Sequence, residues 1–511
     1  MARTPILLAV DAGTTTIKTV AFDTDGNEVA KSTQPNTVLR PASQWAEQDM
    51  VATWTATAAT IEAVTAALPA ESTPVGLSLT AQGDGCWPID ADGEPVRNAI
   101  LWSDSRAAGV LDDWAADGRL ESLVEQCGSS LYPGMSLPLL QWLADEEPDS
   151  FERIATVLSC KDWLRYRLTG ERATDASEAT VPYLDSATET YNPKVFEIVG
   201  LPAAEGVVPP IVPATEIVGT VTERAAAETG LSVGLPVVSG VIDVAASAIG
   251  SGAVTPGTGA VALGTSLVTQ TPIEGPRPET AGIQMATGIE GLWTYAIGSN
   301  AGTPSLDWLR ETVASGDGFD ALESAAASVP LGSEGVLYHP YLSTTGERGP
   351  FVQPDARAQF IGLTPEHTTA HLTRAVYEGL SLAVRDCMNG LPGDIDTLHA
   401  SGGGSGSPFW CQLLADCTGT EVVVPQGSEF GAKGAAVVLG LGLGTYPDLA
   451  TATDRTFEAS ARYTPRSTEV EQYARLYDLY GETRERMERI WTARAETFDA
   501  LADEGPTPSE N

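Results

Sequence analysis

The chain has very few lysines for its length. Only five of its 511 residues are lysine, within a total of 29 basic and 68 acidic residues, so the formal net charge is −39. The hydrophobic share of 42% is enough for a large core, and the charge therefore does not predict disorder. Because so much negative charge repels phosphate backbones and anionic lipid surfaces, we expect neither nucleic acid nor a membrane as a partner.

The excess of acidic over basic residues also indicates how much salt the chain needs in order to fold. A folded chain this acidic repels itself unless salt screens its charges, and at 1 M salt the Debye length falls to about 3 Å. The excess of carboxylates is spread over the whole chain and is not confined to one tail. This bias resembles proteins of extreme halophiles with a salt-filled cytoplasm, and an ordinary acidic protein is the alternative.

Cysteine, histidine and long apolar runs are scarce as well. The six cysteines form no CxxC pair and are too few for a disulfide framework. His367 and His371 lack an HExxH pattern, which favours a surface pair over a zinc site. No run of about 18 apolar residues predicts a membrane helix, and residues 1–10 lack a signal-peptide pattern. These absences predict a reducing, cytoplasmic location.

Two common nucleotide-binding motifs are absent. The sequence contains no GxxxxGK[ST], which excludes a Walker-type P-loop. No GxGxxG follows a predicted strand, so a nicotinamide dehydrogenase is unsupported. Any phosphate binding must therefore come from another kind of glycine-rich turn.

The pattern of apolar and turn residues predicts two α/β halves. Residues 6–11 and 17–23 have the pattern of strands joined by a tight Gly/Thr turn, and a third strand is expected at 28–32. The strand–turn–strand pattern recurs at 261–269. Further helices are expected at about 50–68, 107–127, 136–146, 160–170, 368–390 and 408–418, and strands at 75–80, 236–240 and 396–400.

We expect the chain to divide once along its length. The predicted domains are 1–248, with the first hairpin, and 249–499, with the second, followed by a frayed tail at 500–511. A capping box at 468–471 predicts the start of a long C-terminal helix.

The first Gly/Thr turn has the residues that phosphate binding requires. Gly13 allows a tight turn close to a phosphate, and Thr14 and Thr15 add hydroxyl donors. Asp11, at the end of the strand, could hold Mg²⁺ through water, and Lys18 could reach a phosphate oxygen. An ordinary β-hairpin is the alternative interpretation of this motif taken alone.

Several motifs together resemble a known family. Segments 11–18, 264–266 and 402–404 follow the order of the phosphate and adenosine motifs of actin-like ATPases. Segment 358–363, followed after seven residues by 371–378, matches at every defined position a signature of the FGGY carbohydrate kinases. The resemblance extends from residue 6 to about 445. It implies a two-domain α/β protein of the actin-like ATPase (ribonuclease H-like) fold, with an ATP cleft between the domains.

The resemblance to FGGY kinases identifies Asp243 as the catalytic base. A sugar hydroxyl must lose its proton as it attacks the γ-phosphoryl group, and a nearby carboxylate can accept it. Asp243 follows an apolar strand and lies 22 residues before Thr265, a spacing similar to that of the family. Capping of the following helix is the alternative, and the two roles can coexist.

The same resemblance implies the nucleotide contacts. Backbone amides of both Gly/Thr turns would bind the phosphates, and the 402–404 loop would lie against the adenosine. Magnesium would be held near Asp11. The implied ATP-binding residues are Thr14, Thr15, Lys18, Gly264, Thr265, Asp307, Gly403, Gly404 and Ser407.

The implied sugar site is centred on the loop at 80–85. Gln82 and Asp84 lie where related kinases hold their sugar, and Gly83 is expected to leave room for it. The carboxylate of Asp84 can accept hydrogen bonds from two hydroxyl groups. Trp102 and Asp104 are expected to line the same pocket, although Trp102 could instead be a core residue. Further candidates are Arg106 as a brace, and Trp45 and Gln48 as sugar contacts.

These residues predict ATP-dependent phosphorylation of a terminal hydroxyl of a neutral sugar. A pentulose such as xylulose is the first choice. A polyol kinase of the glycerol or erythritol type and an L-xylulose kinase are the alternatives, and an actin-like sugar sensor without turnover is a remote one. A homodimer is a further possibility.

Overall fold

The computed structural model describes residues 3–185, 187–277, 282–314, 316 and 318–503. The chain forms two compact units. Unit 1 comprises Met1–Pro256, Pro272–Tyr295 and Gln426–Glu458, and unit 2 comprises Gly257–Thr271, Ala296–Pro425 and Ala459–Asn511. The expected division after residue 248 is linear, whereas unit 1 also includes two later segments of the chain.

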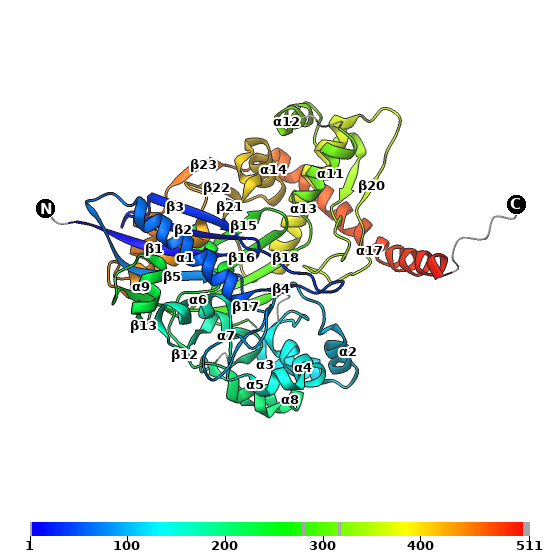
Figure 1. Ribbon diagram of the computed structural model, residues 1–511. Coiled ribbons are helices and arrows are strands. Elements are labelled where there is room, and N and C mark those ends of the chain that lie inside the picture. Colours follow the sequence, from blue (N-terminus) through cyan, green and yellow to red (C-terminus); the bar gives the residue numbers. More distant parts are fainter. Residues whose placement is uncertain (1–2, 186, 278–281, 315, 317, 504–511) are drawn as a thin grey trace, which may run out of the picture. The chain divides into compact units, whose positions relative to one another are not determined.

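Unit 1 is built on a six-stranded sheet with the order β13-β14-β5-β1-β2-β3 (Figure 1). Its strands are β1 (Thr4–Ala12), β2 (Thr16–Phe22), β3 (Glu28–Pro35), β5 (Ser72–Ala81), β13 (Ile217–Thr220) and β14 (Pro236–Val238). β1, β2 and β3 pair antiparallel, whereas β5 pairs parallel with β1 and with β14. β1 is an apolar run with both faces buried, as is typical of a central strand.

Helices pack against this sheet and share the core of unit 1 with its strands. α1 (Met50–Ala67) packs against β2 and β3, and α15 (Phe430–Gly442) packs against β1 and β5. Trp54 of α1 and Trp163 join the buried cluster around Val10. The other helices of unit 1 are α2 (Ala108–Ala116), α3 (Arg119–Cys127), α4 (Ser136–Glu146), α5 (Pro148–Arg153), α6 (Cys160–Thr169), α7 (Ala176–Tyr183), α8 (Pro193–Val199), α9 (Glu223–Thr229), α10 (Asp243–Gly250) and α16 (Leu449–Thr456).

Short strand pairs complete unit 1. They are β4 (Glu47–Gln48) with β7 (Ala99–Ile100), β6 (Trp87–Ile89) with β8 (Thr156–Leu158), β9 (Thr174–Asp175) with β12 (Ile211–Val212), and β10 (Leu184–Asp185) with β11 (Thr190–Tyr191).

The second large sheet has seven strands in the order β17-β18-β16-β15-β21-β22-β23. They are β15 (Thr258–Leu263), β16 (Leu267–Glu274), β17 (Ile283–Ile289), β18 (Leu292–Ser299), β21 (Thr397–Ser401), β22 (Glu421–Pro425) and β23 (Ala459–Tyr463). β15 pairs antiparallel with β16 and parallel with β21, which repeats the arrangement of β1 with β2 and β5.

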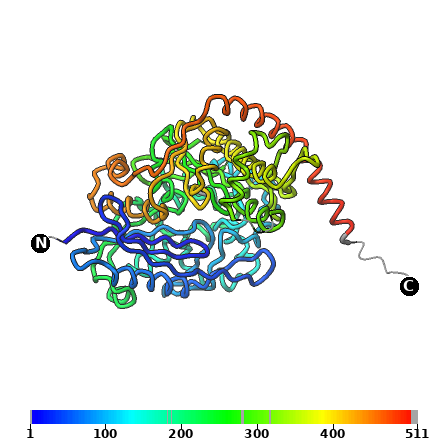
Figure 2. The backbone as a smooth tube through the Cα atoms, turned by 90° about the horizontal axis from the view of Figure 1, so that it is seen from above, coloured from blue at the N-terminus to red at the C-terminus, as the bar shows by residue number. Residues whose placement is uncertain are grey.

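The helices of unit 2 surround a second core. Val261 and Leu263 of β15 belong to it, with Trp410 and Tyr473 from two of the helices. Figure 2 shows the C-terminal part of α17, in red, extending away from the rest of its unit. The elements of unit 2 outside the large sheet are α11 (Pro304–Thr312), α12 (Phe319–Ala327), β19 (Leu337–His339), β20 (Gln359–Ile361), α13 (Thr369–Gly390), α14 (Pro408–Thr418) and α17 (Ser467–Asp503).

Most predicted elements are confirmed, with three differences at boundaries. The helix predicted at 107–127 is two helices, because Gly118 adopts a left-handed backbone with φ 84° between them. The predicted capping box at 468–471 lies inside α17, since Val470 N already donates to Arg466 O at 2.9 Å. The expected tail begins too early, because α17 continues to Asp503; residues 504–511 lie outside the described part.

Candidate active site

The turn between β1 and β2 gathers several predicted residues of unit 1. Gly13 N donates to Thr16 O at 2.9 Å, which closes the turn. Asp11 lies at the end of β1, and Thr15 is exposed at the tip of the turn. Lys18 donates to Glu429 Oε2 at 2.7 Å. The ammonium group of Lys18 thus stays beside the turn, held by a carboxylate from the start of α15.

A hydrogen-bonded network connects this turn to the predicted sugar residues. Thr14 Oγ1 donates to Gln82 Oε1 and accepts from Trp102 Nε1, both at 3.0 Å. Gln48 donates to Thr14 O and accepts from Gln82 Nε2, both at 2.7 Å. The structure therefore places Gln48, Gln82 and Trp102 around one threonine, although they are far apart in the sequence.

Asp243 is the first residue of α10. Its Oδ1 accepts the amide of Val244 at 2.7 Å, while Ile242 occupies the cap position of the helix. Burial raises the pKa of Asp243 to about 7, and the negative charges of Asp11 and Asp84 add to the rise. A carboxyl group with this pKa is suited to accept a proton near neutral pH. The hydrogen bond from Val244 N also gives Asp243 a local role at the start of α10, which is compatible with a role as a proton acceptor.

Asp84 is held in an unusual backbone conformation. Its φ is +55°, and its Oδ2 accepts a hydrogen bond from the hydroxyl of Tyr132. Burial raises the pKa of Asp84 to about 6, against the lowering effect of the Tyr132 hydrogen bond. The expectation that Gly83 leaves room for a sugar is wrong, because a Cβ there would lie 2.0 Å from Cδ1 of Ile242. Ile242 already fills that space.

Sequence reasoning missed the third carboxyl group near this loop. Glu178, in the first turn of α7, lies beside Gly83, whose added Cβ would be 3.7 Å from Glu178 Oε2. Burial raises the pKa of Glu178 well above its usual range, and Asp84 is among the charges that add to the rise. Its Oε1 is buried and has no hydrogen-bond partner among the described residues. No motif marks Glu178 or Tyr132, since only folding brings either residue to Asp84.

Asp104 and Arg106 form a buried, hydrogen-bonded pair beside Trp45. Asp104 Oδ2 accepts from Ala46 N at 2.6 Å, and Asp104 Oδ1 accepts from Arg106 Nε at 2.9 Å. The guanidinium of Arg106 lies 3.9 Å from the ring centroid of Trp45. The predicted brace is therefore found. A direct contact of Asp104 with sugar stays a prediction, because its oxygens already accept these bonds within the chain.

In unit 2, the turn between β15 and β16 packs against a second glycine segment. Thr303 N donates to Gly264 O at 2.8 Å. A Cβ at Gly302 would lie 2.4 Å from Thr265 O and 2.6 Å from Gly264 O, so only glycine fits there. Asp307 follows in α11, half-exposed, with Arg310 at 3.6 Å.

The loop after β21 approaches the same strand end. A Cβ at Gly402 would lie 2.8 Å from Leu263 O, and one at Gly404 would lie 2.3 Å from Trp410. Ser407 caps α14 by accepting the amide of Trp410 at 3.0 Å. Gly403 faces open space. Unit 2 thus gathers its predicted phosphate turn and adenosine loop at the end of β15.

Comparisons with known proteins agree with this geometry. Residues 6–250 match the model of the N-terminal domain of the FGGY family of carbohydrate kinases, and residues 253–443 match that of its C-terminal domain. The chain belongs to the FGGY family of carbohydrate kinases.

Individual relatives match this FGGY kinase over nearly its whole length. Erythritol kinase of Brucella abortus is 31% identical over 95% of this chain and 97% of its own length. L-xylulose/3-keto-L-gulonate kinase of Escherichia coli is 30% identical over 93% of this chain and 95% of its own. The crystal structure of xylulose kinase from Rhodospirillum rubrum has a TM-score of 0.88 at 27% identity and covers 95% of this chain and 100% of that one.

The protein is therefore a carbohydrate kinase with the actin-like ATPase fold, and its family uses ATP with a divalent metal ion. The donor groups of this FGGY kinase fit such a metal. Burial raises the pKa of Asp11 to about 6, against the effect of Lys18, and among the described residues nothing donates a hydrogen bond to its carboxylate. The described part of the chain has no group of three or more His, Cys, Asp or Glu residues that could enclose an ion. A single carboxylate suits an ion that keeps water and phosphate ligands, as Mg²⁺ does.

Two further findings concern this kinase as a whole. Within the described residues, no helix is long and apolar enough to span a membrane. His367 and His371 stack edge to face with ring centroids 5.3 Å apart, and each accepts a backbone N–H at the start of α13 or just before it. The histidine pair thus serves local hydrogen bonding.

Proposed function

We propose that this FGGY kinase transfers the γ-phosphoryl group of ATP to a terminal hydroxyl of a neutral sugar, with Asp243 as the general base. The observation that carries the proposal is the carboxyl group at the start of α10, whose pKa burial raises to about 7. Neighbouring Asp11 and Asp84 add to that rise, so Asp243 can hold a proton as readily as release it at neutral pH.

The roles of the other residues follow from their positions. Asp84, Gln82, Trp102 and Asp104 form or brace the acceptor site, and Asp243 takes the proton of the reacting hydroxyl. Bound ATP supplies the phosphoryl group, and Mg²⁺ near Asp11 offsets the charge of its phosphates. The proposed nucleotide contacts are Thr14, Thr15 and Lys18 in unit 1, and Gly264, Thr265, Asp307, Gly403, Gly404 and Ser407 in unit 2.

We propose a pentulose such as xylulose as the acceptor. Kinases of xylulose and L-xylulose are among the relatives that match over most of the chain. Asp84 accepts hydrogen bonds from hydroxyl groups and, when ionised, repels an anionic acceptor, which favours a neutral sugar over a sugar acid.

A four-carbon polyol is the second candidate. The observation that favours it is the 31% identity to erythritol kinase over nearly the full length of both chains. Ile242 also narrows the space beside Gly83, which suits a smaller acceptor.

An acceptor screen distinguishes these candidates. The purified chain in molar KCl with ATP and Mg²⁺ is given D-xylulose, L-xylulose, erythritol, glycerol or gluconate, and ADP release is measured. We expect the highest kcat/KM with a pentulose. Preference for erythritol selects the second candidate, preference for gluconate contradicts a neutral acceptor, and no turnover with any of them contradicts the proposed reaction. The Asp243→Asn variant controls for contaminating kinases.

A homodimer and a cytoplasmic location belong to the same proposal. Light scattering in molar KCl checks the first, since a dimer has twice the chain mass of 53.4 kDa. Both stay predictions from the sequence.

A further inference from the structure

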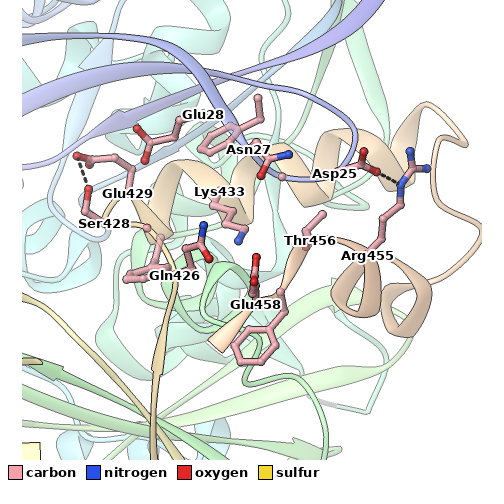
Figure 3. Close-up of a pocket in the computed structure, with 15 residues that line it drawn as sticks. Asp25, Asn27, Glu28, Gln426, Ser428, Glu429, Lys433, Arg455, Thr456 and Glu458 are labelled. Carbon is pink, nitrogen blue, oxygen red and sulfur yellow. Dashed lines mark hydrogen bonds and ion pairs between the residues drawn. The ribbon is translucent and has the colours of Figure 1, made fainter. Parts of the chain in front are cut away.

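A cavity of about 470 Å³ lies in unit 1 at the end of β2 opposite the Asp11–Lys18 turn (Figure 3). Its wall includes the turn between β2 and β3, the segment 426–430, and parts of α15 and α16. β2 has seven residues and a strand advances about 3.3 Å per residue, so the two ends are roughly 20 Å apart. The volume lies in the range typical of small-molecule sites.

The wall of this cavity is held in place by the chain itself. Gly26, with φ 81°, packs so closely on Thr456 that an added Cβ would lie 2.8 Å away. Arg455 donates to Asp25 at 2.6 Å and to Thr24 at 2.8 Å, which fixes the turn onto α16. The cavity is therefore preformed and needs no folding of a loop to exist.

Lys433 points from α15 into this cavity, as Figure 3 shows. Its exposed fraction is 8%, and within the described residues it makes no ion pair. Lys161, the other buried lysine, contacts Asp162 at 2.6 Å and Asp175 at 2.8 Å. Burial lowers the pKa of Lys433, and Glu28 and Glu458 oppose this. Because no described residue accepts a hydrogen bond from this ammonium, water or a ligand in the cavity must be its partner.

The charges around Lys433 limit what that ligand can be. Of the charged groups that line the cavity, Asp25 pairs with Arg455, and Glu429 pairs with Lys18 and Lys31. This leaves Lys433 with Glu28 and Glu458, so a small anion is repelled by the two carboxylates and a small cation by the amine. Side-chain amides of Asn27 and Gln426 add donors and acceptors. A neutral molecule with several hydroxyl groups satisfies both kinds of partner, because each hydroxyl donates and accepts.

The cavity also has apolar surface for the carbon skeleton of such a molecule. Phe22, Phe430 and Phe457 line it. Aromatic walls combined with convergent polar groups are typical of sites for small organic ligands. We propose that unit 1 carries a second, non-catalytic site in the Lys433 cavity, which binds a small neutral polyhydroxylated molecule such as a sugar or polyol.

Glu429 connects this cavity to the turn that carries the proposed phosphate contacts. Its carboxylate lines the cavity and accepts from Lys18 at 2.7 Å and from Lys31 at 3.1 Å. Two residues later, Gly431 lies so close to Asp11 that an added Cβ would be 2.6 Å from its carboxylate. Glu429 and Gly431 thus join one wall of the cavity to Lys18 and Asp11.

Chemical labelling tests the proposal at the residue itself. The full chain in molar KCl is acetylated at alkaline pH with and without ribitol, and mass spectrometry follows Lys433, with exposed Lys194 as the internal control. We expect saturating ribitol to slow acetylation of Lys433 about tenfold or more and to leave Lys194 unchanged. No protection by ribitol, or no labelling of Lys433 in the free chain, overturns the proposal.

Two comparisons sharpen this test. Inorganic phosphate replaces ribitol in one experiment, and glycine betaine, a zwitterion without hydroxyl groups, replaces it in another. Protection by either without protection by ribitol overturns the assignment of a neutral polyhydroxylated ligand. Calorimetry then counts ribitol sites, and we expect Lys433→Met to lose one site that Lys194→Met keeps; equal numbers overturn the proposal. None of these measurements uses ATP, so a failure of the proposed kinase reaction leaves them unaffected.

Discussion

The turn between β1 and β2 is flanked by Asp11 and Lys18, whereas the turn between β15 and β16 has no ionisable residue from Leu263 to Leu267. The backbones are alike. Each first strand pairs antiparallel with the second and parallel with a later strand, and each turn exposes a threonine at its tip. The same strand arrangement therefore carries ionisable side chains at one turn and none at the other.

The surroundings of the two turns differ in the same way. Around the first, burial raises the pKa of Asp11 to about 6 and that of Asp243 to about 7, and the charge of Asp11 adds to the rise at Asp243. Around the second, close backbone packing at Gly302 and Gly402 replaces side chains. This difference supports the proposal that unit 1 supplies the general base and the metal contact and that unit 2 offers backbone groups to phosphate.

Among these predictions, removing the carboxylate of Asp243 should have the largest effect on activity. We expect Asp243→Asn to lower kcat by about 10² or more, because the general base is lost, while ATP binding stays nearly intact. Steady-state kinetics and nucleotide titration measure both quantities. Normal turnover of the variant would contradict the role of Asp243 as the general base.

Replacing Asp84 tests whether the acceptor depends on unit 1 alone. We expect Asp84→Ala to raise the KM for the acceptor by about tenfold to a hundredfold, since a lost hydrogen bond to a buried polar group is worth about 1–3 kcal/mol. The KM for ATP should stay near its original value. Exposed Asp92→Ala is the control. If the acceptor KM does not move, Asp84 is only a turn residue.

Adding a methyl group at Gly302 tests the backbone packing of unit 2. We expect Gly302→Ala to raise the KM for ATP and to destabilise the chain by about 1–3 kcal/mol, because its Cβ would overlap two carbonyl oxygens. Denaturant unfolding measures the stability. Gly481→Ala, which meets open space in α17, is the matched control. Equal behaviour of the two variants would contradict close packing at the second turn.

The pH dependence of turnover should follow the ionisation of Asp243. The general base must be ionised, so kcat/KM should rise about tenfold per unit as pH increases toward about 7, and then level off. Stability should change in the opposite direction. Between the ordinary value of 3.8 and about 7, the folded state binds more protons than the unfolded state, and the free energy of unfolding falls as pH rises. Asp243→Asn should remove only the part of this fall that Asp243 contributes, because the raised pKa values of Asp11, Asp84 and Glu178 act in the same direction. A pH profile of stability that the substitution leaves unchanged would contradict the raised pKa of Asp243.

Salt tests the charges that lie outside both turns. With a net charge of −39, we expect the melting temperature to rise by about 5 °C or more from dilute buffer to molar KCl, as screening weakens the surface repulsion. Potassium glutamate in place of KCl separates screening from chloride binding. A melting temperature independent of salt would contradict the halophile interpretation.

Much of the fold could be predicted because it follows from local patterns. The apolar run of β1, the glycine stop of α6 at Gly170 and the bounds of α4 are set by residues within a few positions of each other. The break at Gly118 was missed, because one glycine in a helical pattern does not show whether it will adopt a positive φ.

The sequence by itself determined the two Gly/Thr turns, the position of Asp243 after its strand and the membership of the family. Only the tertiary structure decided that Ile242 fills the space beside Gly83 and that Tyr132 and Glu178 approach Asp84. The same holds for the cavity around Lys433, whose walls come from the first and the last of the three chain segments that form unit 1. Strand and turn patterns depend on neighbours in sequence, whereas burial, pKa values and cavities depend on side chains that meet only after distant segments pack.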